Sequence, residues 1–216
     1  SEGTNTITAD VSDVAGNAAT QSSTTFIYDK TAPSISSITP SWGSHLNATE
    51  DNSSGTITVA TSGVEDGQTV TVGLNGTNYT GSISSNSVTI TISATDLQAL
   101  SEGTNTITAN VSDAAGNAAS QSSTTFTYDK TSPSITSITP SWGSHLNATE
   151  DNSSGTVTVA TSGIEDGQTV TVGLNGTNYT GSVSSNSVTI TISATNLQAL
   201  SEGTNTITAN VSDAAG

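Results

Sequence analysis

The sequence predicts an all-β protein built from tandem β-sandwich domains of about 100 residues each. One observation is internal repetition, because residues 1–116 match residues 101–216 at all but 10 positions. This period is longer than the roughly 20–50 residues of a solenoid repeat and suits a complete domain. The other observation is that apolar residues alternate with Ser and Thr in short runs, as in half-buried strands.

The period divides the chain into three parts. Residues 32–131 are expected to form one complete domain, residues 1–31 the C-terminal part of a preceding repeat, and residues 132–216 a repeat without its last strand. A lone two-stranded hairpin is marginal in water. We therefore expect residues 1–31 to pair with upstream sequence or with a neighbouring molecule.

Seven strands are predicted in the complete domain. The first spans 34–39 and ends before Pro40, and the Asn75-Gly76 dipeptide supplies the positive φ angles of a tight hairpin turn. A short helical turn is expected at 96–100. Strands at this spacing indicate an immunoglobulin-like Greek-key sandwich. The other six strands are expected at 56–60, 69–74, 77–79, 88–92, 104–111 and 122–128.

The apolar members of these strands define the predicted core. Three of the repeat differences exchange Ile and Val, and such exchanges typically cost only about 0.5–1.5 kcal/mol, so the core is expected to be unchanged between repeats. The inward set comprises Ile57, Val59, Val70, Val72, Leu74, Ile90, Ile92, Ile107, Ala109, Val111, Phe126 and Tyr128.

Composition excludes several classes of partner. The chain has 18 acidic and two basic residues and a net charge of −16. Binding to nucleic acid or anionic lipid needs Lys and Arg, so neither is expected. Cysteine is absent, so no disulfide can form, and no apolar run approaches the ~20 residues of a membrane span. Such a high charge repels itself, and bound cations would relieve the repulsion.

The acids are expected at the two ends of each sandwich. Counting strands places Asp29, Glu65 and Asp113 at the end where the chain comes in, hereafter the N-terminal end, and Glu102 and Asp129 at the opposite, C-terminal end. In a tandem array these ends face each other, so each junction would collect carboxylates. The junction candidates are Asp29, Glu65, Asp66, Glu102, Asp113, Asp129, Glu165, Asp166 and Asp213, with Glu2, Asp13, Asp51 and Asp151 as a second group.

Converging carboxylates favour a calcium site. Ca²⁺ takes 6–8 oxygen ligands in flexible geometry, which suits contributions from several loops. Zn²⁺ is disfavoured because only His45 and His145 could supply nitrogen and no Cys is present. The alternative interpretation is that these acids are solvated turn formers. Positions 10 and 96 are weaker candidates because Asn replaces Asp there in other repeats.

No catalytic constellation is predicted, and the protein is not expected to be an enzyme. His45 lies near Ser44 and Glu50 only because the chain is rich in such residues. Trp42 and Tyr79 could form a carbohydrate platform, although Trp42 covering the end of the core is the favoured interpretation. Ranks of outward Thr could suggest ice binding, but Thr favours strands in general and a short twisted sheet offers a poor flat lattice.

The motifs resemble a known family. DKTAP at 29–33, HLNATED at 45–51, EDGQTVTVGLNGTNYT at 65–80 and DLQALSEGTNTITANVSDAAGN at 96–117 are similar to the bacterial Ig-like repeats of very large RTX adhesins, which Gram-negative bacteria secrete. The resemblance covers the whole chain. It implies an extracellular, non-catalytic extender at the bacterial surface, between a membrane-anchored end and a ligand-binding tip that lies outside these residues.

The resemblance also implies Ca²⁺ at the domain junctions. Asp29, Asp113, Asp129 and Asp213 match the acidic linker and hairpin positions, while Lys30 and Lys130 inside the linkers depart from the expected pattern. The expected partners are neighbouring repeats of the same chain in a monomeric array. The alternative function is a carbohydrate- or surface-binding Ig-like module that acts by avidity.

Overall fold

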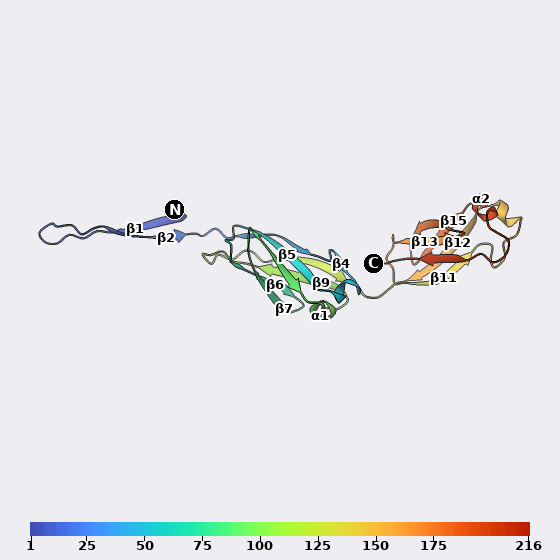
Figure 1. Cartoon of the computed structure of the whole chain (residues 1–216), viewed down its shortest axis with the longest axis horizontal. Coiled ribbons are helices and arrows are strands. Elements are labelled where there is room, and N and C mark those ends of the chain that lie inside the picture. The colour runs from blue at the N-terminus through green and yellow to red at the C-terminus, as the bar shows by residue number, and fades with distance from the viewer. The chain divides into compact units, whose positions relative to one another are not determined.

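The computed structural model describes all residues from Ser1 to Gly216, and its fold is all-β, as predicted (Figure 1). Strands dominate, and the two α-helices have five residues each. Neither helix is long and apolar enough to cross a lipid bilayer. The chain divides into two compact units, one of Ser1–Ser44 with Thr49–Thr127 and one of His45–Ala48 with Tyr128–Gly216.

The complete repeat contains two sheets with immunoglobulin-like strand order. One sheet has the order β3-β5-β8, and the other has the order β4-β10-β9-β6-β7. The backbone N–H of Thr127 in β10 donates to Ser44 O at 2.9 Å, which extends the second sheet toward β4. The strands are β3 (Ser34–Pro40), β4 (His45–Leu46), β5 (Gly55–Ser62), β6 (Thr69–Leu74), β7 (Thr77–Ser82), β8 (Ser87–Ile92), β9 (Gly103–Asn110) and β10 (Ser122–Tyr128).

The strand predictions are confirmed to within a few residues, with one omission. The two-residue strand β4 was not expected, because a pair of residues is too short to show an alternating pattern. Asn75 and Gly76 have φ of 49° and 76°, as the predicted turn between β6 and β7 requires. The helical turn is α1 (Ala94–Gln98), which starts two residues earlier than predicted.

The core follows the alternation of the strands. Every member of the predicted inward set is at most 5% exposed. Trp42 is 8% exposed, and its ring meets Phe126 edge-on with centroids 5.2 Å apart, which confirms that it covers the core rather than forming a platform. The inward set of strand residues left out Leu46 and Val88, and also Val64 and Ile83, which are buried from loops where no period-two pattern exists.

The N-terminal hairpin shows how burial depends on a second sheet. Strands β1 (Gly3–Ala9) and β2 (Ser22–Tyr28) pair with each other and form a separate two-stranded sheet. Phe26 is therefore 48% exposed, whereas the equivalent Phe126 is 2% exposed. The same local sequence forms the same hairpin in both places, but only the complete domain covers its apolar face.

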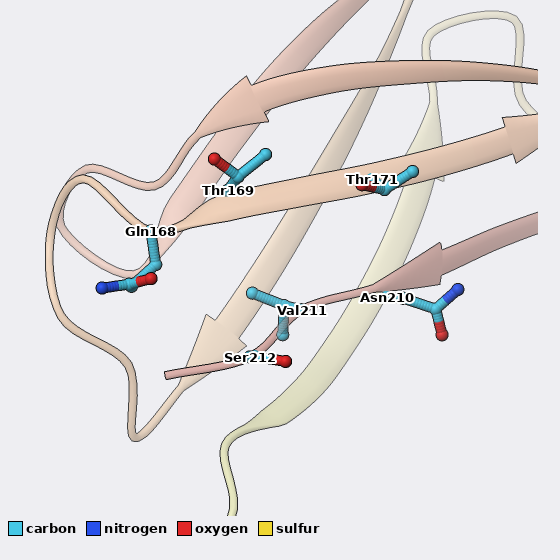
Figure 2. Close-up of a pocket in the computed structure, with 6 residues that line it drawn as sticks. All are labelled: Gln168, Thr169, Thr171, Asn210, Val211 and Ser212. Carbon is cyan, nitrogen blue, oxygen red and sulfur yellow. The ribbon is translucent and has the colours of Figure 1, made fainter. Parts of the chain in front are cut away.

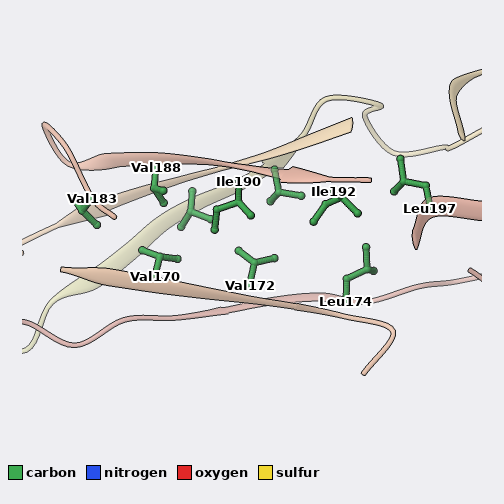
Figure 3. Close-up of a cluster of buried hydrophobic side chains, with 10 residues drawn as sticks. Val170, Val172, Leu174, Val183, Val188, Ile190, Ile192 and Leu197 are labelled. Atoms are coloured by element: carbon green, nitrogen blue, oxygen red, sulfur yellow. The ribbon is translucent and has the colours of Figure 1, made fainter. Parts of the chain in front are cut away.

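The second unit repeats the two-sheet arrangement over the residues present. Its sheets have the orders β11-β12-β15 and β14-β13-β16, and the pairing register of β12 with β15 equals that of β5 with β8 shifted by 100 residues. Valine, isoleucine and leucine side chains from both sheets meet in its core (Figure 3). The elements are β11 (Ser134–Pro140), β12 (Gly155–Ser162), β13 (Thr169–Leu174), β14 (Thr177–Ser182), β15 (Ser187–Ile192), α2 (Ala194–Gln198) and β16 (Ile207–Asn210).

No strand of the structure contains a charged residue. All 18 acids and both lysines lie in loops, turns or short helices. The outward strand positions instead carry Thr and Ser in ranks, such as Thr39, Thr58 and Thr89 across β3, β5 and β8. The Oγ1 atoms of Thr58 and Thr89 lie 3.1 Å apart. The outward faces of the sheets, hereafter the flanks of the sandwich, therefore present uncharged hydroxyl groups to solvent.

Gly55 is predicted to be irreplaceable because it makes room for Trp42. A Cβ at position 55 would lie 2.6 Å from the Trp42 ring, closer than such atoms approach. Gly55→Ala should lower the free energy of unfolding by about 1–3 kcal/mol, measured by urea denaturation. In a double-mutant cycle, Trp42→Leu should relieve most of this cost. Strictly additive effects of the two substitutions would show that the ring is not the cause.

Candidate metal centre

Three acidic segments meet at the N-terminal end of the complete sandwich. The backbone N–H of Ala114, in the β9–β10 hairpin, donates to Glu65 Oε2 in the β5–β6 loop at 2.9 Å. The side-chain amide of Asn117 donates to the backbone O of Asp29 in the linker at 3.3 Å. Segments that are 36 and 48 residues apart in sequence therefore converge at the end where the strand count placed them.

Asp113 is the most enclosed of these acids, at 3% exposed. Its Oδ1 accepts the backbone N–H of Asn117 at 2.8 Å, and its Oδ2 accepts the Asn117 side-chain amide at 2.9 Å. Burial raises the pKa of Asp113, but the hydrogen bonds from Asn117, Gly116 and Ala115 outweigh it and bring the pKa below its ordinary value. The carboxylate is therefore held ionised by its own hairpin.

The same turn forms wherever its sequence occurs. In the N-terminal hairpin, Asp13 accepts the backbone and side-chain N–H groups of Asn17, both at 2.8 Å, and the side-chain bond is the main cause of a lowered Asp13 pKa. In the second unit, Asp213 Oδ1 accepts the N–H groups of Ala215 and Gly216 at 3.0 and 2.9 Å. Local sequence alone is enough to build this carboxylate-centred turn.

Asp66 contacts a different loop from its neighbour Glu65. Its Oδ1 accepts the backbone N–H of Ser85 at 2.7 Å, in the turn between β7 and β8. Ser85 and Asn86 both have positive φ, of 52° and 61°, an arrangement that a β-hairpin turn favours but Ser rarely adopts. Asp66 therefore stabilises this turn.

The linker acids contact the linker backbone itself. Asp29 Oδ1 accepts the Thr31 N–H at 2.9 Å. Glu2 Oε1 accepts the Lys30 N–H at 3.1 Å and the Thr31 hydroxyl at 3.0 Å. These acids are therefore bound into the turn of the chain at residues 29–31.

The second unit shows the same set of contacts. Glu165 Oε2 accepts the Ala214 N–H at 3.0 Å, Asp166 Oδ1 accepts the Ser185 N–H at 2.7 Å, and Asp129 Oδ1 accepts the Thr131 N–H at 2.9 Å. Asn47 adds a side-chain amide, which donates to Ala215 O at 2.7 Å. Lys130 Nζ lies 5.7 Å from the centre of the Tyr128 ring, which holds its charge over an aromatic face.

The remaining acids lie at the C-terminal end of each sandwich. Asp51 is buried in the short 3-10 helix Glu50–Asn52, and Asp151 is half-buried in the equivalent helix of the second unit. The side-chain amide of Gln98 in α1 donates to Asn52 Oδ1 at 3.1 Å and so connects α1 to the 3-10 helix. Glu102 lies between α1 and β9. The Ser93 hydroxyl donates to Asp96 Oδ2 at 2.8 Å and accepts the Asp96 backbone N–H at 3.2 Å, so these two residues stabilise the start of α1.

The donor chemistry of the N-terminal end fits a hard cation. The atoms there that could coordinate a metal ion are carboxylate and carbonyl oxygens, which Ca²⁺ prefers as ligands. No three His or acidic side chains are close enough together to form a ready-made ion cage. Glu65 instead contacts the backbone N–H of Ala114, the residue that follows Asp113. Carbonyl oxygens and water would have to complete a coordination shell.

A hollow and a histidine are two further features of the surface. A hollow of about 490 Å³ in the second unit lies beside the ends of β13 and β16, and its lining is uncharged (Figure 2). The His145 Nδ1 atom lies 3.0 Å from the hydroxyl oxygen of the adjacent Ser144. The residues lining the hollow are Gln168, Thr169, Thr171, Asn210, Val211 and Ser212.

Comparison with known proteins agrees with the fold. Residues 36–130 match the bacterial Ig-like domain family, so this repeat has the fold of that family, as the sequence resemblance predicted. The second repeat has nearly the same sequence. No curated protein matches the chain.

Several solved adhesin structures are similar to the chain. A Ca²⁺-stabilized adhesin that helps an Antarctic bacterium reach out and bind ice is 22% identical, with a TM-score of 0.42, over 98% of this chain and 56% of that one. A tetra-tandem repeat from the extending region of a large adhesion protein is 18% identical, with a TM-score of 0.40, over 98% and 53%. A bacterial immunoglobulin-like domain of the M. primoryensis ice-binding adhesin is 25% identical, with a TM-score of 0.35, over 44% and 99%. The chain thus spans little more than half the length of the first two.

The lowered Asp113 pKa predicts a specific loss of stability in acid. A carboxylate whose folded-state pKa is below its ordinary value of 3.8 stabilises the fold above that value, and this stability is lost as the pH falls through the folded-state pKa. Asp113→Asn should be less stable than the parent near neutral pH and should lose less stability between about pH 5 and 2. Urea midpoints across this range measure both effects.

The control for this experiment is Gln98→Ala, because the Gln98 amide contacts Asn52 and no carboxylate. It should retain the acid dependence of the parent. Asn117→Ala, which removes a donor to Asp113, should behave like Asp113→Asn. An acid dependence that stays the same in both Asp113→Asn and Asn117→Ala would contradict the assignment.

Proposed function

We propose that this chain is a segment of the extender, or stalk, of a bacterial surface adhesin, and that Ca²⁺ bound at the domain ends makes the stalk rigid. The observation that carries the proposal is the distribution of charge. None of the 20 charged residues lies in a strand, so the acids are confined to the loops, turns and short helices that connect the strands. Neighbouring repeats of the same chain are the proposed partners, outside the cell.

Near-identical repetition supports a mechanical role. Copying a complete sandwich adds length with each domain, since its strands of up to eight residues rise about 3.3 Å per residue. The uncharged Thr and Ser flanks contain no cluster of acid, base and nucleophile. A domain of this kind gains function from being repeated rather than from a site on one copy.

The proposed ligands are the junction candidates. Glu65, Asp29 and Asp113 come from three segments at one end, and Glu165, Asp129 and Asp213 are their equivalents in the second unit. When bound, Ca²⁺ would neutralise carboxylates that otherwise repel one another and would restrict the linker. Glu102, Asp66 and Asp166 belong to the same proposal, with Glu2, Asp13, Asp51 and Asp151 as supplementary donors.

Chelation tests the calcium proposal. Saturating Ca²⁺, at about 100 times its Kd, should stabilise the folded state by about 2.7 kcal/mol, which corresponds to a rise in Tm of roughly 10 °C or more for domains of this size. Small-angle scattering should show a larger maximum dimension with Ca²⁺ than with EGTA, because restricted linkers prevent bending.

Variants locate the effect. The double variant Glu65→Gln and Glu165→Gln keeps the shape of both side chains but removes their charge, so it should weaken Ca²⁺ binding measured by calorimetry. Asp96→Asn is the matched control, because the second repeat already has Asn196 there and the Asp96 carboxylate accepts the hydroxyl of Ser93, the N-cap residue of α1. Equal Tm and equal dimensions with Ca²⁺ and with EGTA would refute the calcium site.

A further inference from the structure

We propose that the linker at residues 29–31 is locked by direct hydrogen bonds from both sides, through Glu2 and Asn117, before any cation binds. The inference takes its biological purpose from the proposed stalk function but needs no metal. All the groups involved lie in the first compact unit. Asn117 carries no charge and was not among the predicted site residues.

Glu2 holds the linker from the preceding hairpin. A single carboxylate oxygen, Oε1, accepts both the Lys30 backbone N–H at 3.1 Å and the Thr31 hydroxyl at 3.0 Å. Hydrogen bonds to an ionised acceptor are roughly twice as strong as neutral ones. Glu2 lies 28 residues before Lys30, so these contacts connect the start of β1 with the residues that follow β2.

Asn117 holds the linker from the following domain. A side-chain amide has two N–H donors, and Asn117 uses them on two different acceptors. One bond goes to Asp113 Oδ2 at 2.9 Å and fixes the amide within its own hairpin. The other goes to the backbone O of Asp29 at 3.3 Å and fixes the linker. The amide therefore joins the linker to an ionised carboxylate through one rigid group.

The N-terminal hairpin shows that the first of these bonds is local. Asn17 makes the equivalent bond to Asp13 Oδ2 at 2.8 Å within its own hairpin. The orientation of the amide is thus set by its turn in advance. Its second donor is available to a linker carbonyl at no further cost in side-chain entropy.

Neutrality is the chemical reason for Asn at this position. The amide contacts the Asp113 carboxylate and the Asp29 backbone O, and an acid in its place would repel Asp113 and leave both acceptors without a donor. A donor instead satisfies a carboxylate and a carbonyl together. Thr31 completes the arrangement, because its own N–H donates to Asp29 Oδ1 at 2.9 Å and closes the turn of the linker.

Amide dynamics in the presence of EGTA test the lock on the ¹⁵N-labelled 216-residue chain. The Lys30 and Thr31 amides should have order parameters near ~0.85, typical of rigid backbone, although Ca²⁺ is removed. Glu2→Ala should lower them toward ~0.6 and accelerate exchange of the Lys30 amide about tenfold, because its acceptor is lost. Asn117→Asp keeps the side-chain shape but loses the donor, and should likewise lower the order parameters of residues 29–31.

The repeats supply internal controls. Lys130 and Thr131 lie in the equivalent linker and should not change in either variant, and their signals differ because residues 27 and 32 differ from residues 127 and 132. Asn17→Ala removes the matching hairpin bond without touching the linker and should leave residues 29–31 unchanged. Exchange of the Gly116 amide reports whether the Asn117 variant has disrupted its hairpin. If the Asn117 variant has disrupted its hairpin, the order parameters and exchange rates of Glu2→Ala alone decide whether the lock exists.

The results separate this inference from the calcium proposal. Rigid Lys30 and Thr31 amides in EGTA, together with no effect of Ca²⁺ on Tm or dimensions, would support the lock and refute the calcium site. Mobile amides in EGTA that become rigid only with Ca²⁺ would overturn the lock and support the calcium site. Unchanged order parameters and exchange in Glu2→Ala would also overturn the lock.

Discussion

The two-residue period of the β-strand is the constraint on which the rest of this structure depends. Each strand turns one face to the core and one to solvent, so every second residue must be apolar and the others must suit an exposed sheet surface. The chain meets both demands with Val, Ile and Leu inside and with Thr and Ser outside. Charge is therefore excluded from the strands and is concentrated where strands end.

Concentrating acids at the ends creates an electrostatic cost that the loops themselves reduce. Glu65 accepts an N–H from Ala114, Asp29 accepts one from Thr31, and Asp113 accepts two from Asn117. Each acid is thus given a backbone or amide donor with good geometry. This explains how so acidic a chain builds ordered loops, and it leaves the ends rich in oxygen atoms that suit a hard cation.

Internal repetition allows local and tertiary effects to be compared within one molecule. The turn at Asp13 and Asn17 is the same as the turn at Asp113 and Asn117, because a few neighbouring residues supply every bond in it. Burial behaves differently, since Phe26 is exposed and Phe126 is buried although both hairpins have almost the same sequence. Secondary structure here is a local property, while the core requires both sheets.

The sequence by itself determined the all-β class, the positions of the main strands, the inward-facing residues and the presence of acids at the ends, because alternation and turn chemistry act over a few neighbouring residues. Only the tertiary structure decided the short strand β4, the burial of Val64 and Ile83, and the contacts of Asp66 and Asn117. The segment that contains β4 is held by the hydrogen bond from Thr127 N–H in β10 to Ser44 O. The Asn117 amide donates to the backbone O of Asp29, which is 88 residues away in the sequence. Such pairings depend on how distant segments come together, and no local pattern encodes them.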